Sequence, residues 1–385
     1  MNFRLYVSVL VSIALLPFAS VAGDFEEDLY WYKSSLSFAK IPEDSADDFL
    51  NPFKGPTEFR LTEKYAPWAG NYFPMAEGGI AQRWQTGHSF KKIHTKKAIV
   101  NMTAEQRRKL SPVEKYDIYK GFYDFRTTQH EIFNRGVLRE PSPEEWEGFC
   151  NGVRCAGFLL DEPIRAVEVE NRDGVRVVFE PADLKALAGA SYFYTEDYAQ
   201  LGSPSQRKKA ESQPNPVVFD MVLRHRLARH KKPFVIDSNL SSEIWNETVV
   251  GFNREIRSVT FTAKDRELYP SAEKKVRVDV ILDTLGEVDI AESNLPTKEK
   301  VANGSLLDTV ETSYYLFLDS NNKALDGRWV RSSGDRGVDF VWFAAGRGRD
   351  KQYADQGGNP FLEFKTIRKL IKEAAKPMCE NALEG

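Results

Sequence analysis

Trp146-Glu147-Gly148-Phe149-Cys150-Asn151-Gly152 places a cysteine between two glycines, directly before a stretch in which apolar residues recur at three- and four-residue steps. That spacing predicts a buried helix over residues 150–160. The free N–H groups and the dipole at a helix N-terminus favour negative charge, and therefore a thiolate. The same N–H groups can hold an oxyanion. Cys150 is therefore the candidate nucleophile.

The local sequence also allows a second interpretation, in which Cys150 is a small buried hydrophobic residue without reactivity. Cys155, five residues further along the same helix, is predicted to serve in packing. Cys379 brings the number of cysteines to three, so in an exported chain at least one thiol stays free or pairs between molecules. This count excludes a small scaffold held together by disulfides.

A thiolate nucleophile needs a base, and the base needs a group that orients it. Downstream of Cys150, Asp220 opens an apolar segment and Asp237 ends a strand-like run. Of the five histidines, only His225 and His230 lie near the partner position, and His225 would be inert on a solvated face. The order of cysteine, partner and aspartate resembles that of papain-like thiol enzymes. The candidate catalytic residues are therefore Cys150, Asp220, Asp237 and His225.

The remaining elements follow from periodicity and from residues typical of helix ends and turns. Helical spacing covers residues 102–129, with Thr103 as N-cap and Gln106 three residues later, and a second helix is expected from Ser142. Residues 181–187 open another helix, and an amphipathic helix over 359–376 is expected to dock on the protein rather than on a membrane. The predicted strands are 166–169, 175–179, 233–237, 258–263, 275–282, 313–319 and 338–342.

The N-terminal 22 residues have the pattern of a signal peptide. A basic residue, Arg4, precedes an apolar run over 5–18, and Ser20-Val21-Ala22 offers the small residues of a cleavage site. An uncleaved anchor is the alternative. No other segment is apolar enough to cross a bilayer, so we expect a secreted or periplasmic protein that has no membrane association after signal removal.

Length and composition indicate a globular protein of two or three domains. We expect a signal peptide at 1–22, a helical and irregular region at 23–135, a catalytic core at 136–265, a β-rich region at 266–350 and a C-terminal helix at 351–385. The net charge of −3 gives no indication of nucleic-acid binding. The sequence does not indicate an oligomeric state.

Several segments in the same order resemble one known family. The Trp-x-Gly-x-Cys-x-Gly pattern at 146–152 is similar to the nucleophile segment of the transglutaminase elicitors of oomycetes and marine bacteria. Residues 68–74, 215–219 and 234–237 also fit that family, and 244–252 is similar to the surface segment by which plants detect these enzymes. The resemblance covers about residues 60 to 345.

This resemblance implies an α+β fold, with a papain-like cysteine-enzyme core between a helical N-terminal region and a β-rich C-terminal region. It implies that the cysteine thiolate attacks a protein-bound glutamine, ammonia leaves, and a lysine amine takes the acyl group. The partners would be proteins that carry Gln and Lys side chains. The resemblance also implies calcium dependence, but no loop has EF-hand spacing, and no other cofactor is implied.

The chain departs from the family pattern at two places. Asp220 stands where the family has histidine, and Val153-Arg154-Cys155 stands where a Trp-like residue is expected. We expect Asp220 to point toward Cys150 from the histidine position; alternatively, His225 reaches the site. Two other functions therefore stay open: a family member without catalysis that binds protein surfaces, and a thiol peptidase or amidase.

The segment 244–256 is expected to be mostly exposed, with Trp245 as its anchor. We expect Asn246 and Asn253 to be accessible, and Val249 and Phe252 to point inward. Glycosylation sequons occur at Asn101, Asn239, Asn246 and Asn303.

Overall fold

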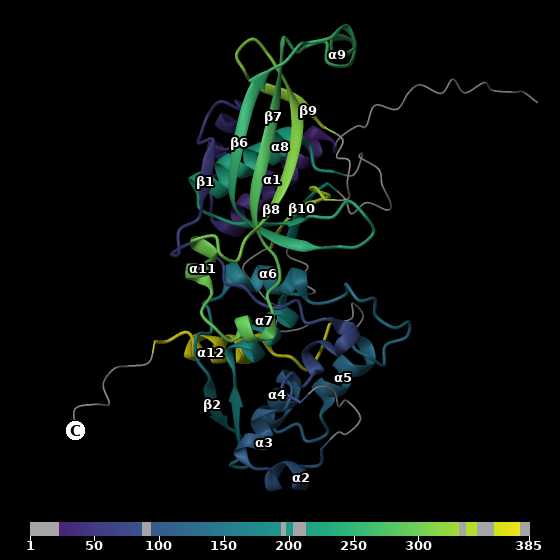
Figure 1. Cartoon of the computed structure of the whole chain (residues 1–385), viewed down its shortest axis with the longest axis vertical. Coiled ribbons are helices and arrows are strands. Elements are labelled where there is room, and N and C mark those ends of the chain that lie inside the picture. The colour runs from purple at the N-terminus through teal and green to yellow at the C-terminus, as the bar shows by residue number, and fades with distance from the viewer. Residues whose placement is uncertain are drawn as a thin grey trace, which may run out of the picture.

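The computed structural model describes residues 23–86, 94–193, 198–202, 213–330, 336–344 and 358–377. The predicted signal peptide and Cys379 lie outside these residues. The fold combines helices with an antiparallel sheet (Figure 1), which agrees with the expected mixture of helix and strand.

The main sheet has the strand order β4-β10-β5-β6-β7-β8-β9, with β1 pairing with β6 beside this path, among the residues that the structure describes. Its strands are β1 (Glu58–Arg60), β4 (Tyr198–Leu201), β5 (Phe234–Asp237), β6 (Asn246–Ser258), β7 (Lys274–Leu285), β8 (Asp308–Leu318), β9 (Ala324–Trp329) and β10 (Val341–Ala344). All of these pairings are antiparallel. The pairing of β6 with β7 crosses the domain boundary expected at residue 265, so one sheet continues through both regions.

One hydrophobic core lies against this sheet, in the upper half of Figure 1. It contains residues of α1 (Phe25–Leu36), of α8 (Pro216–Met221) and of a π-helical turn, Val222–Arg229, which continues α8. Two short helices, α10 (Ile290–Ser293) and α11 (Lys298–Ala302), follow β7, and α9 (Ala263–Leu268) caps the far end of the sheet.

The second core lies in the lower half of Figure 1. Its elements are α2 (Lys96–Asn101), α3 (Ala104–Arg108), α4 (Pro112–Lys120), α5 (Arg126–Asn134), α7 (Pro181–Phe193), α12 (Phe364–Ala374), and the hairpin of β2 (Val167–Glu170) and β3 (Arg176–Phe179). Helix α6 (Cys150–Leu159) lies between this helical half and the sheet, in contact with α7, β5 and β6.

Several predicted elements are confirmed. The hairpin, the helix that begins at Pro181 and the strand before Asp237 all form. The C-terminal helix is docked: Phe364, Ile367 and Leu370 bury its apolar face in the second core. None of the helices in the described part of the chain is long and apolar enough to span a membrane.

Three predicted elements differ from the structure. The helix expected over 102–129 is three helices, because Ser111 caps a new helix with a capping box and Gly121 ends it in a left-handed conformation. No helix starts at Ser142; Glu147 instead pairs with Arg139. The strand expected over 258–263 is wrong, because β6 ends there and Thr262 caps α9.

Candidate functional site

Cys150 is the first residue of α6, as the sequence predicts. The N-cap residue, Phe149, makes no side-chain capping bond, and in the first turn the N–H of Gly152 donates to the Oδ1 of Asn151 at 2.6 Å. The backbone N–H of Phe149 donates to the carbonyl of Tyr72 at 2.6 Å, which ties the helix start to the segment between β1 and α2. Cys150 is 8% exposed, so the thiol lies just below the surface.

The glycines that flank Cys150 serve close packing. A Cβ atom on Gly152 would lie 2.0 Å from the carbonyl oxygen of Gly189 on α7. A Cβ atom on Gly148 would lie 2.6 Å from the carbonyl oxygen of Tyr72. The motif therefore lets α6 approach α7 and Tyr72 closely, and this approach positions the thiol.

The thiol has one hydrogen-bond partner among the described side chains, Asn246 at the start of β6. The Nδ2 of Asn246 donates to the Cys150 Sγ at 3.3 Å. The Oδ1 of Asn246 accepts from the indole Nε1 of Trp342 at 2.9 Å. Because an indole N–H can only donate, it sets the orientation of the amide and directs Nδ2 toward sulfur.

Arg154 follows Cys150 by one helical turn and binds the backbone of Asn246. Its Nε donates to the backbone carbonyl of Asn246 at 3.3 Å, and its Nη1 donates to the carbonyl of Gly70 at 3.1 Å. The guanidinium is buried, with the residue 1% exposed. Arg154 thus joins the chain on both sides of the cysteine.

Asp237 lies at the end of β5, opposite Asn246 in the register of β5 and β6. Its Oδ1 accepts from the backbone N–H groups of Asn239 at 3.1 Å and of Trp245 at 2.9 Å. Burial raises the pKa of Asp237 to about 7 in spite of these two hydrogen bonds, which lower it. Asp237 therefore holds the loop that leads to Trp245 and to Asn246, the residue that contacts Cys150.

Asp220 points elsewhere. Its Oδ2 accepts from the Nε of Arg224 at 2.9 Å, and its Oδ1 accepts from the hydroxyl of Tyr314 at 2.6 Å and pairs with Arg254 at 2.8 Å. The expected orientation toward Cys150 is thus corrected: both carboxylate oxygens are engaged by two arginines and a tyrosine. The expected role of Asp220 in the histidine position has no geometric support here.

His225 also lies away from the thiol. Its Nδ1 is hydrogen-bonded to the Tyr32 hydroxyl at 2.7 Å and its Nε2 to the Ser45 hydroxyl at 2.7 Å. Burial, aided by nearby positive charges, lowers the pKa of His225 to about 4, so the ring is neutral near pH 7. Both ring nitrogens are engaged by α1 and by the turn that contains Ser45, rather than by the Cys150 site.

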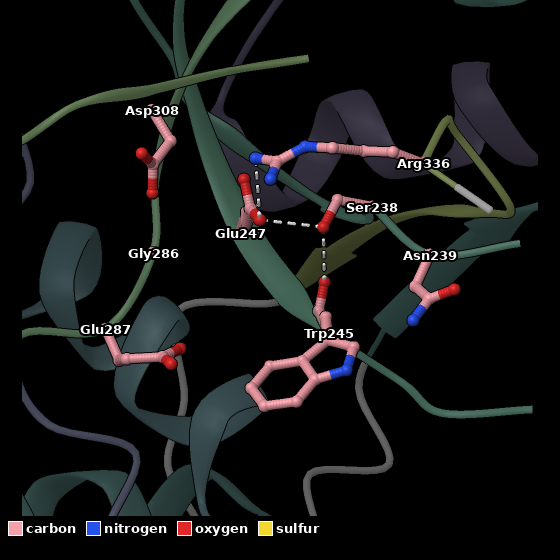
Figure 2. A pocket seen from close by; sticks show the side chains of 8 residues that line it. All are labelled: Ser238, Asn239, Trp245, Glu247, Gly286, Glu287, Asp308 and Arg336. Carbon is pink, nitrogen blue, oxygen red and sulfur yellow. Dashed lines mark hydrogen bonds and ion pairs between the residues drawn. The ribbon is translucent and has the colours of Figure 1, made fainter. Parts of the chain in front are cut away.

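A cavity of about 440 Å³ opens beside Trp245 (Figure 2). Its lining residues are Ser238, Asn239, Trp245, Glu247, Gly286, Glu287, Asp308 and Arg336. Glu247 accepts from the Ser238 hydroxyl at 2.7 Å and pairs with Arg336 at 3.5 Å, while Glu287 and Asp308 face them across the cavity. The ring of Tyr72 lies 6.1 Å from that of Trp245, between this cavity and the start of α6.

Within the described residues, no group of three or more His, Cys, Asp or Glu side chains could hold a metal ion. The calcium dependence implied by the family resemblance stays a prediction.

The expectation that the segment 244–256 is mostly exposed is wrong: only Asn253 and Glu255 are exposed, because β6 is a central strand of the sheet. Val249 and Phe252 are buried and Asn253 is exposed, as expected. The expected accessibility of Asn246 is wrong: the residue is 6% exposed, because its side chain faces Cys150.

The sequence-based interpretation missed Asn246, Trp342 and Arg154 as parts of the site. Asn246 belongs to a segment that the sequence predicts to be exposed, and none of its neighbours in the sequence indicates that it contacts a thiol. Arg154 was noted only as a departure from the family pattern. A charged residue four positions after a candidate nucleophile, on the otherwise apolar face of a buried helix, was the available signal.

Comparisons with known proteins agree on one family. The family model described as Transglutaminase elicitor matches residues 142–377. The chain is similar in structure to the GP42 transglutaminase from Phytophthora sojae, with a TM-score of 0.66 and 18% sequence identity, over 91% of this chain and 98% of that one. At this identity the likeness shows a shared fold. No curated protein matches the chain in sequence.

Proposed function

The chain belongs to the transglutaminase elicitor family, and from this premise we propose that it is an exported protein-glutamine γ-glutamyltransferase that acts through a Cys150 thioester on a papain-like core. The observation that carries the proposal is the place of Cys150. It stands at the start of α6, whose N-cap residue makes no side-chain capping bond, and it accepts a hydrogen bond from the amide of Asn246, the neighbour of the cavity-lining Trp245.

The proposed reaction balances without a further reactant. The Cys150 sulfur forms a bond to the side-chain carbonyl carbon of a glutamine, the C–N bond breaks, and the thiol proton leaves with ammonia. A lysine amine then attacks the thioester, an amide bond forms, and the thiol is restored with the amine proton. The N–H groups at the start of α6 and the Asn246 amide stabilise negative charge at sulfur during these steps.

The cavity beside Trp245 suits a basic side chain of the protein substrate. Three carboxylates line it against one arginine, and the indole ring offers an apolar wall for the methylene groups of a lysine. Glu287 and Asp308 make no ion pair within the described part of the chain, so their charge is available to an incoming ammonium.

One observation favours a second function, that of a binding protein without catalysis. The group that contacts the thiol is an amide, and an amide cannot accept the thiol proton as an imidazole does. In this case the site keeps its shape and presents the Trp245 cavity to a protein surface.

Incorporation of a fluorescent primary amine into casein separates these functions. We expect incorporation by the mature wild-type chain and none by Cys150→Ala, while Cys155→Ala, which changes a buried packing cysteine in the same helix, retains it. Absence of incorporation by the folded wild type, with or without added calcium, would support the binding function. New N-termini in casein without incorporated amine would instead identify a peptidase.

A further inference from the structure

Arg154 carries a buried charge for which the structure shows no carboxylate partner. The residue is 1% exposed, its Nη2 has no hydrogen-bond partner, and within the described residues it makes no ion pair. A buried ion without a partner is unfavourable, because no opposite charge offsets its loss of hydration. A charge kept at such a cost requires an explanation from its surroundings.

The surroundings of Arg154 are the Cys150 site. Residues four apart on a helix lie on the same face, so the guanidinium lies on the face of α6 that carries the thiol. Its two hydrogen bonds are to the carbonyls of Asn246 and Gly70. Asn246 is the residue whose side chain contacts the thiol. Arg154 holds its backbone, and Trp342 holds its side chain.

The charges around Arg154 support the same assignment. Burial lowers the pKa of the guanidinium, and the negative forms of Glu287, Cys150 and Glu247 oppose that shift. Two of these acidic groups lie at the Trp245 cavity, where Glu247 also pairs with Arg336. Cys150 is the acidic group on the same helix as Arg154, one turn away.

We propose that Arg154 is the positioning residue of this site: it fixes the Asn246 amide on the thiol and supplies the positive charge that papain-like enzymes obtain from an imidazolium. This inference rests on Cys150 as the nucleophile of the proposed function. Thiol alkylation tests it separately from amine transfer, so that the two can fail independently.

Arg224 provides a matched control. It is also 1% exposed, it also stands four residues after an acidic group, Asp220, and it also donates to backbone carbonyls, those of Phe49, Asn51 and Lys54. Its charge is compensated by a carboxylate, and it lies in the other core. A loss that follows merely from disturbing a buried arginine would therefore occur at both positions.

The experiment is iodoacetamide labelling of the full mature chain, followed by mass spectrometry of the Cys150 peptide over a range of pH. Far-UV circular dichroism confirms that each variant is folded. For Arg154→Met we expect alkylation at pH 7 to slow about tenfold, since the thiolate is the reactive form and a nearby cation favours it. The curve of rate against pH should move to higher pH.

Arg154→Lys keeps the charge but loses the planar fork that reaches both carbonyls, so its rate should lie between those of the wild type and Arg154→Met. Arg224→Lys should leave the rate and its pH dependence unchanged. A folded Arg154→Met variant that is alkylated at the wild-type rate would overturn the proposal. If Arg154→Met does not fold, a wild-type rate in Arg154→Lys, or an equal loss in Arg224→Lys, would overturn it.

Discussion

Two buried arginines, each one helical turn after an acidic group, differ in how their charge is compensated. In the sheet core, Arg224 and Arg254 share the carboxylate of Asp220, and Tyr314 donates to it as well. In α6, Arg154 lies one turn after the thiol and has no carboxylate partner among the residues that the structure describes. The carboxylate of Asp220 is therefore fully engaged by protein groups, whereas the positive charge of Arg154 can still act on the thiol.

This difference explains why residue type alone was a poor guide. Asp220 and His225 have the side chains that general acid–base chemistry uses, and both are engaged in structural hydrogen bonds. Asn246 has an amide, which does no acid–base chemistry, and yet it contacts the thiol. In this protein, direct contact with the thiol in the folded chain indicates the site better than the identity of the residues does.

The largest effect on stability is expected from removal of the Asp220 carboxylate, which pairs with Arg224 and Arg254. Asp220→Ala leaves two arginines buried without their carboxylate, so we expect it to lower the free energy of unfolding by about 3–5 kcal/mol. Urea denaturation measures this loss, with the exposed Asp161→Ala as control. Alkylation of Cys150 in the folded fraction should not change; slower alkylation would mean that the two regions are coupled. Asp220→His should likewise destabilise the protein rather than raise amine incorporation.

The next effect concerns pH and the Cys150 region. Burial raises the pKa of Asp237 to about 7, so the folded state holds a proton that the unfolded state releases near pH 4. Stability therefore falls as pH rises from about 4 to about 7, by on the order of 4 kcal/mol from this residue. The difference in unfolding free energy between wild type and Asp237→Asn, measured across this range, should show that slope. A constant difference would contradict it.

The contribution of His225 to the free energy of unfolding should depend on pH in the opposite direction. Because the pKa of His225 is lowered to about 4, the unfolded state takes up a proton at a higher pH than the folded state does. The stability from neutral His225 is present above about pH 6.5 and falls by on the order of 3 kcal/mol as the pH drops to about 4. His225→Gln should remove this loss relative to wild type in thermal melts at pH 4 to 7. An unchanged acid-side slope would show that His225 is protonated in the folded state.

The smallest effect tests how the Asn246 amide is oriented. Trp342→Phe keeps the ring but removes the indole N–H that donates to Asn246, which should cost about 1 kcal/mol of stability. Without this donor the amide can turn its oxygen toward the sulfur, so alkylation of Cys150 should slow. Trp329→Phe is the control, because it removes an equally buried indole hydrogen bond, to the Pro214 carbonyl, in the other core. Equal alkylation in both variants would exclude an orienting role for Trp342.

The sequence by itself determined the local features of this protein. It predicted the helix that starts at Cys150, the hairpin of β2 and β3, and the docked C-terminal helix, because caps, turns and apolar periodicity act over a few residues. The motif at 146–152 and the segments in the same order also indicated the family, which the comparisons confirm. Prediction was wrong where a cap or an ion pair a few residues away outweighed the pattern, as at Thr262 and Glu147.

Only the tertiary structure decided which side chains meet. Asn246 reaches Cys150, 96 residues away in the sequence, because β5 and β6 pair in one register and Trp342 on β10 turns the amide. Asp220 turns to Tyr314, 94 residues away, because α8 packs on β8. The physical reason is the same in both cases: a buried polar group must find a partner, and the partner available to it is set by the packing of distant elements rather than by its neighbours in the chain.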